Sequence, residues 1–127
     1  MAHIPPLSFK VQSTLAAYRF VSAVTGTAQT VKYPAAVTSP LFGVTLDTVK
    51  DTTSAIPVAG PGTLAKVFFN DTVTSGNLVA SDSSGRGIPH VDATAGSYVG
   101  GILVGPTVAA TGTIADVFIN PFFKSIP

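Results

Sequence analysis

The sequence predicts an all-β protein, a small β-barrel or sandwich built from two related halves with an extended N-terminal arm. Three observations lead to this fold class. A nine-residue segment with the pattern of a strand occurs twice. Turn-forming residues are frequent, with 12 Gly and 10 Pro among 127 residues. Charged residues make up only 10% of the chain and Glu is absent, so the residues that usually cover exposed helices are scarce.

The duplicated segment is residues 62–70 (GTLAKVFFN), which returns as residues 112–120 (GTIADVFIN) with six of nine positions identical. A charge inverts between Lys66 and Asp116, and this change is tolerated only where the side chain reaches solvent. The unit should therefore be a strand with one solvent-exposed face. We expect the two copies to form equivalent strands related by a local two-fold axis, with both charged side chains exposed.

Two further matches lie upstream in the same order. Residues 20–26 resemble residues 79–85, and residues 41–46 resemble residues 98–103. Together with the duplicated segment, these matches indicate an internal duplication. Two copies are too few for a stacked solenoid, so the two related halves should close around one core.

The first half, about residues 17–70, contains short candidate strands separated by turn residues. Gly43 lies inside one of them and predicts a bulge or a close approach of a neighbouring backbone. Pro57 restricts another to a sheet edge or to the start of a strand. The expected strands are residues 18–24, 30–33, 41–46, 56–58 and 64–69.

The second half, about residues 76–120, follows a short linker and has the same character. A polar turn is expected at residues 82–85 (DSSG). No window shows a sustained 3.6-residue apolar period, so no long helix is expected. Both halves should form a single β domain at residues 15–121, since short strands at this spacing are typical of sandwiches and barrels. The expected strands are residues 77–81, 87–91, 98–104 and 113–119.

Both ends of the chain are expected to make contacts beyond this domain. Residues 1–14 should form an extended arm, because Pro5 and Pro6 prevent a helix and the apolar residues that follow favour packing against another surface. Residues 122–127 should form an apolar tail that packs on the core or on a neighbouring subunit. The candidate interface residues are Ile4, Leu7, Phe9, Phe122, Phe123 and Ile126.

The composition limits the classes of partner. The net charge is +1 and the seven Lys and Arg residues are scattered, so no nucleic-acid partner is expected. The longest apolar stretch, residues 99–104, is far too short to span a membrane, and the first residues lack the pattern of a secretory signal. The absence of Cys excludes disulfides and thiol catalysis. Because monomers usually expose more charge, part of this surface should be covered in an assembly.

The sequence contains only weak matches to catalytic and metal-binding motifs. His90 and Asp92 lie close to serines in the sequence, but no Gly-x-Ser-x-Gly turn presents a nucleophile. Asp47 and Asp51 share a polar loop, where solvation is their expected role. Residues 82–85 resemble the start of a calcium loop but lack alternating acidic ligands and a closing Glu, so a hairpin turn is favoured. We assign no catalytic, cofactor-binding or metal-ligating residue and expect no enzyme activity.

The second half carries a recognisable order of motifs: SGNLVASD at residues 75–82, RGIP at 86–89, GSYVGGI at 96–102 and ATGTIADVFINP at 110–121. This order resembles the small cement, or decoration, proteins of tailed-phage capsids. The resemblance covers residues 75–121 well and the first half loosely, and its motifs are patterns of turns and strands. Pro106 interrupts the chain where the family often continues into an acidic turn.

The resemblance implies a β-rich and usually trimeric protein that sits outside the shell and clamps neighbouring coat subunits. It therefore implies a structural virion protein on the outer capsid surface, made in the host cytoplasm, with the major capsid protein and further copies of itself as partners. The alternative is a carbohydrate- or receptor-binding β-module of a phage tail or cell surface. Such modules usually stack sugars on exposed aromatic residues, and this chain has no Trp.

Overall fold

The structure is a computed structural model that describes residues 7–36, 38–51, 53, 55–91 and 96–124. These residues form strands and turns, which confirms the all-β fold class. Accordingly, this part of the chain contains no helix that could cross a membrane. The strands are β1 (Leu7–Val11), β2 (Phe20–Ala23), β3 (Thr30–Lys32), β4 (Gly43–Thr45), β5 (Ile56–Ala59), β6 (Leu64–Phe68), β7 (Leu78–Ser81), β8 (Gly87–Pro89), β9 (Ser97–Leu103) and β10 (Ile114–Lys124).

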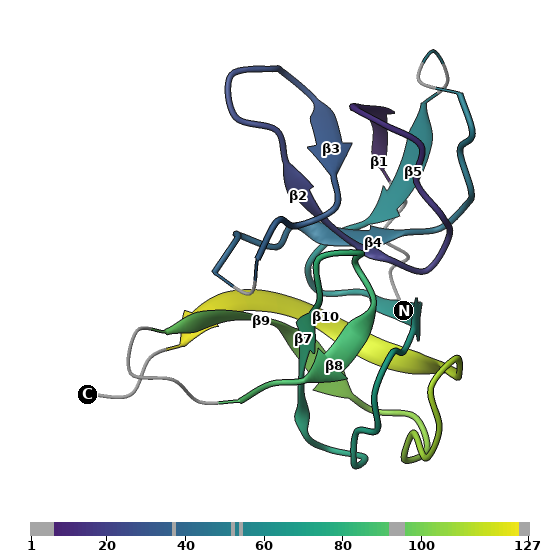
Figure 1. The fold of residues 1–127 in the computed structure, drawn as a ribbon, viewed down its shortest axis with the longest axis vertical. Coiled ribbons are helices and arrows are strands. Elements are labelled where there is room, and N and C mark those ends of the chain that lie inside the picture. Colours follow the sequence, from purple (N-terminus) through teal and green to yellow (C-terminus); the bar gives the residue numbers. More distant parts are fainter. Residues whose placement is uncertain (1–6, 37, 52, 54, 92–95, 125–127) are drawn as a thin grey trace.

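The strands build two units, with the barrel above the second sheet in the view of Figure 1. Strands β1 to β5 form a closed barrel in the order β1-β3-β2-β4-β5, in which β1 and β3 run parallel. Strands β6 to β10 form a five-stranded sheet in the order β6-β10-β9-β7-β8. Just after β6, Phe69 makes a parallel bridge with Gly87 of β8, so the two edges of this sheet meet at one end.

The two units share one topology. The strand order β3-β2-β4-β5-β1 of the barrel returns in the sheet as β8-β7-β9-β10-β6. The register returns as well, because Val21 pairs with Gly43 in the barrel and Val79 pairs with Gly101 in the sheet. The units therefore meet at residues 60–63, between β5 and β6. The sequence placed this boundary near residues 70–76, but β6 belongs to the second unit because it pairs with β10.

Gly43 and Gly101 occupy equivalent places in the two units. A Cβ atom on Gly43 would collide with the carbonyl oxygen of Ala59, and one on Gly101 would collide with that of Phe118. Only glycine fits at both places, because a neighbouring backbone occupies the space of a side chain. The close approach expected at Gly43 is thus confirmed. Pro57 is the second residue of β5, near the strand start that its missing N–H favours.

The duplicated nine-residue segment forms β6 and β10, and its two copies pair with each other. Lys66 lies directly opposite Asp116 in the antiparallel register. Gly62 and Gly112, which precede the two strands, both adopt a left-handed conformation (φ 85° and 86°). A local two-fold axis thus passes between Lys66 and Asp116, whose side chains are 60% and 50% exposed. The expectation of equivalent, two-fold-related strands with exposed charges is confirmed, although both copies lie within the second unit.

One hydrophobic cluster joins the barrel to the sheet. Phe20 of β2 is fully buried in it, together with apolar residues of β6, β7, β9 and β10. The Phe20 ring lies against Gly100 of β9, where a Cβ atom would be 2.7 Å from the ring's Cζ. The Phe20 N–H donates to the Gly85 carbonyl in the β7–β8 turn (2.7 Å). A second cluster fills the barrel and contains Val11, Leu15, Val21, Val31, Val49, Ile56 and Val58.

Both terminal segments take part in the fold. β1 pairs with β3 and β5, so residues 7–11 of the expected arm close the barrel. β10 continues past a register shift after Ile119 and pairs with β9 as far as Ser97. Residues 122–124 of the expected tail are therefore strand residues. In both places the apolar residues lie on strands whose backbone groups are paired, which satisfies their hydrogen bonds better than an extended free segment would.

Candidate functional site

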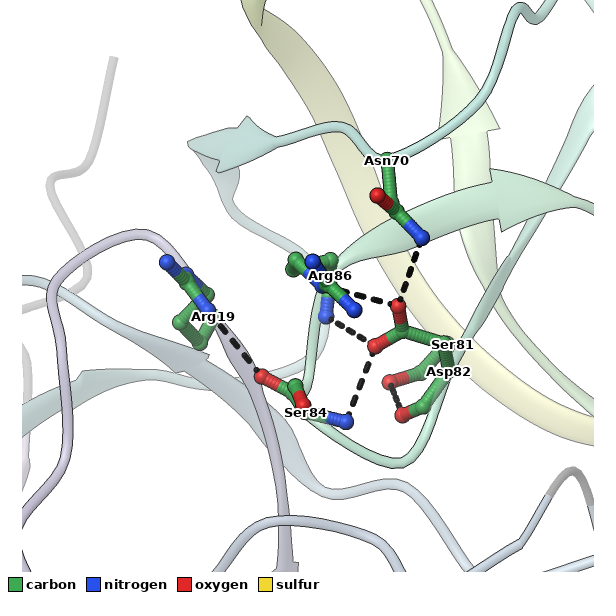
Figure 2. A network of polar contacts seen from close by, with 6 residues as sticks. All are labelled: Arg19, Asn70, Ser81, Asp82, Ser84 and Arg86. Atoms are coloured by element: carbon green, nitrogen blue, oxygen red, sulfur yellow. Dashed lines mark hydrogen bonds and ion pairs between the residues drawn. The ribbon is translucent and has the colours of Figure 1, made fainter. Parts of the chain in front are cut away.

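The partly buried carboxylate of Asp82 organises the turn between β7 and β8 (Figure 2). Asp82 accepts hydrogen bonds from the Ser84 N–H, the Arg86 N–H and the Arg86 Nε, each at 2.9 Å. The Asn70 amide adds a fourth bond at 3.2 Å. Because both carboxylate oxygens are engaged by donors of the chain, Asp82 acts as a structural turn residue. The hairpin turn expected at residues 82–85 is confirmed, with Gly85 at φ 76°.

Arg19 connects this turn to the barrel, as Figure 2 shows. Its guanidinium group donates to the Ser84 carbonyl (3.3 Å) and lies over the Phe68 ring, 4.7 Å from the centroid. The Phe68 N–H in turn donates to the Tyr18 carbonyl (2.9 Å). A guanidinium placed over an aromatic face is attracted by the ring quadrupole. These contacts hold the start of β2 against the second unit from outside, while Phe20 does so from the core.

Other residues that suggested chemistry also have local partners. Asp51 accepts the Thr53 N–H (2.9 Å), and this bond holds the pKa of the Asp51 carboxyl below its ordinary value. His90 Nε2 lies 2.7 Å from Ser97 Oγ. Asp92 lies outside the described residues. Within the part of the chain that the structure describes, no group of three or more metal-binding side chains comes together.

Two of the three predicted contact residues of the N-terminal segment, Leu7 and Phe9, lie on β1 of the barrel. Ile4 lies outside the described residues. Leu7 is the first residue of β1, where it pairs with Val58. Phe9 is half-buried and packs edge-to-face on Phe42, with ring centroids 5.1 Å apart. Much of the Phe9 ring is therefore occupied by contacts within the barrel.

The predicted contact residues at the other end of the chain are more available. Phe122 and Phe123 of β10 are 36% and 50% exposed. Phe123 packs edge-to-face on Tyr98 of β9, with ring centroids 5.5 Å apart. Ile126 lies outside the described residues. Phe9 packs on the barrel cluster, and Tyr98, the partner of Phe123, packs on the cluster that joins the units.

Sequence reasoning missed a second exposed apolar surface, on the face of the sheet that points away from the core. Leu64, Ile114 and Phe118 are 63%, 44% and 39% exposed. They surround the Lys66–Asp116 ion pair (Nζ to Oδ1, 3.3 Å). The signal was present in the duplicated segment, because the outward positions next to the inverted charge are apolar in both copies.

Comparisons with known proteins find similarity only at the level of structure. No family model matches the chain, and no curated protein matches it. Among solved structures, the chain is similar to the crystal structure of the head fiber gp8.5 N base of bacteriophage phi29, with a TM-score of 0.69 and 17% sequence identity. The alignment covers 90% of this chain and 92% of that chain, so the likeness in fold extends over both units.

Proposed function

We propose that this protein is a structural component of a phage virion that binds the outside of an assembled capsid and stabilises it. The observation that carries the proposal is the likeness in fold, over nearly the whole of both chains, to the base of a phage head fibre. The order of turn and strand motifs at residues 75–121, which resembles capsid cement proteins, supports the same class of function. The role would be mechanical and involve no catalysis.

The exposed aromatic pair at the end of β10 is our proposed contact with the major capsid protein. Phe122 and Phe123 lie at the end of the longest strand, and the edge-to-face packing on Tyr98 holds one of the rings in place. Pre-ordered aromatic side chains contribute large apolar areas to an interface at little entropic cost. Ile4, Leu7, Phe9 and Ile126 remain proposed contacts that could extend this surface onto the capsid or onto a neighbouring copy.

We further propose that the chain works as a homo-oligomer, expected to be a trimer, with its two units acting as a single domain. The shared cluster around Phe20 supports a rigid joint between the units. Several copies that bind together need only modest affinity each, because the effective concentration of the second contact is high.

The proposal is tested by co-sedimentation of the purified protein with intact capsids and, separately, with unassembled coat protein. We expect binding to the assembled shell, weakened by Phe123→Ser and more strongly by the double change with Phe122→Ser. Val91→Ser, at a residue that is 73% exposed and lies beyond β8, is the matched control. Deletion of residues 1–6 tests the N-terminal contact while leaving β1 intact.

Absence of co-sedimentation at saturating protein would contradict the proposal. Binding to a glycan array without binding to capsids would favour the carbohydrate-binding alternative instead. If the Phe variants bind like the control variant, the proposed contact is wrong even if the protein binds capsids.

A further inference from the structure

The outer face of β6 and β10 is apolar where a solvent-facing sheet is normally polar. We define this outer face by five side chains that point away from the core: Leu64, Lys66, Ile114, Asp116 and Phe118. Phe68 lies on the same side of β6 but is covered by the Arg19 guanidinium. The most exposed apolar residue of this face is Leu64, at 63%. Antiparallel sheets with one solvated face usually alternate apolar-in and polar-out. Within the paired stretches 64–68 and 114–118, the outward positions are apolar except for one central ion pair.

The apolar character continues across the sheet in register. Phe118 pairs with Leu64 on one side and with Ile102 of β9 on the other. Ile102 in turn pairs with Leu78 of β7. A row of large apolar side chains therefore crosses four neighbouring strands. Leu64 and Phe118 of this row are exposed, and Ile102 and Leu78 are half-buried. Contiguous apolar surface marks an interaction site more often than isolated exposed residues do.

The edges of the sheet are less suited to a partner than its face. The two edge strands are β6 and β8. β8 ends with Pro89, which cannot donate to an added strand. On β6, the Phe68 N–H is already bound to Tyr18 of the barrel, and Lys66 places a charge at the edge. A partner should therefore pack on the outer face and not extend the sheet.

We infer that copies of this chain associate through the outer face, about a rotation axis that runs parallel to β6 and β10. The occupant is a second copy because the outer face is complementary to itself. It carries one positive and one negative group side by side, so a strongly acidic or basic partner would leave one of them opposed by a like charge. Rotation of a second copy about this axis places Lys66 of one copy opposite Asp116 of the other. It also places the apolar residues on either side of the ion pair opposite those of the other copy.

An axis perpendicular to the strands would instead place Lys66 opposite Lys66, and like charges across an interface are strongly disfavoured. The charge pattern therefore selects the orientation. The same arrangement closes a pair by two-fold symmetry and can also close a ring of three. This inference rests on the self-association part of the proposed function and is independent of which surface touches the capsid.

The test uses two charge variants of the full chain, Lys66→Asp and Asp116→Lys, measured by light scattering alone and as an equal mixture. Each variant alone opposes like charges between copies and should run at the 12.9 kDa of a single chain. In the mixture, each negative face meets a positive face, so the mass should rise again. Within each chain the repulsion persists, so recovery reports on contacts between copies. Lys10→Asp, an exposed lysine of β1, is the matched control and should assemble like the natural chain.

The apolar part is tested by Leu64→Gln, which we expect to raise the dissociation constant about tenfold or more, with Val91→Gln unchanged. The inference is overturned if the natural chain is a single chain at tens of micromolar, if either charge variant assembles normally, or if the mixture does not recover. If the protein is an oligomer that none of these changes weakens, the outer face is not the interface, but the proposed function is not contradicted. If the protein is a monomer and still binds capsids, only the proposed self-association is wrong.

Discussion

Replacing Gly100 by alanine should loosen the joint between the barrel and the second sheet. The new Cβ atom would lie 2.7 Å from Cζ of the Phe20 ring. That ring is fully buried in the shared cluster. Overpacking of this kind costs about 1–3 kcal/mol. For a domain of this size, 1 kcal/mol corresponds to a melting-temperature shift of about 3–5 °C, so we expect a decrease of about 3–15 °C.

The assay is thermal and urea unfolding followed by far-ultraviolet circular dichroism. Gly60→Ala is the control, because a Cβ atom there would meet no other atom within 4 Å, and it should change stability by less than about 0.5 kcal/mol. Phe20→Leu should partly rescue Gly100→Ala, with a coupling of about 0.5–3 kcal/mol. If Gly100→Ala is as neutral as the control, or if the two changes are strictly additive, the packing argument is wrong.

Two further outcomes follow from the polar contacts. Asp82→Ala should destabilise the protein by about 1–3 kcal/mol in urea unfolding, because the donors of Asn70 and Arg86 lose a partly buried acceptor; an unchanged midpoint would contradict this role. The hydrogen bond from Thr53 lowers the pKa of Asp51, so its stabilisation is present above the ordinary value of 3.8 and is lost as the pH falls through the lowered pKa. The difference in melting temperature between the natural chain and Asp51→Asn should therefore vanish in strong acid, and a difference that grows on acidification would contradict the assignment.

The positions of β2 to β9 and of the first part of β10 could be predicted from the sequence because the signals are local. A strand expected at residues 77–81 is found as β7, Leu78–Ser81, and the turn that follows has its glycine at the left-handed position. Alternation of side chains and turn residues acts within a few residues, and tertiary contacts did not override it here.

The division of the chain depends on which strands pair, and local signals do not contain that information. The strongest repeat, of residues 62–70, links two neighbouring strands of one unit that share an environment around a local two-fold axis. The weaker matches follow the duplication of the whole unit but are shifted by one residue. They align Gly43 with Gly100 and Phe20 with Val79, whereas in the structure Gly43 corresponds to Gly101 and Val21 to Val79. Similarity between two segments shows that they occupy similar surroundings, but those surroundings can lie in the same sheet or in two.

The outer face was missed for a related reason. The inverted charge at Lys66 and Asp116 correctly indicated solvent, and the same strand parity places Leu64 and Phe118 in solvent too. When apolar residues occupy both the odd and the even positions of a strand, the sequence pattern alone cannot show which of its two faces packs on the core. The terminal segments were expected to pack on the core or on another surface. Their strand partners could not be predicted, because β1 and the end of β10 pair with strands distant in the sequence.

The proposed stabilisation of a phage capsid from outside is tested by heating particles with and without this protein. A ligand that binds only the assembled state stabilises it by about 2.7 kcal/mol per site at a hundredfold excess over Kd. Genome release is followed with a DNA-binding dye, and purified protein is added back to depleted particles to separate its effect from damage during depletion. We expect depleted particles to release DNA at a lower temperature and added protein to restore the higher one. Equal release temperatures for particles with and without the protein would contradict it.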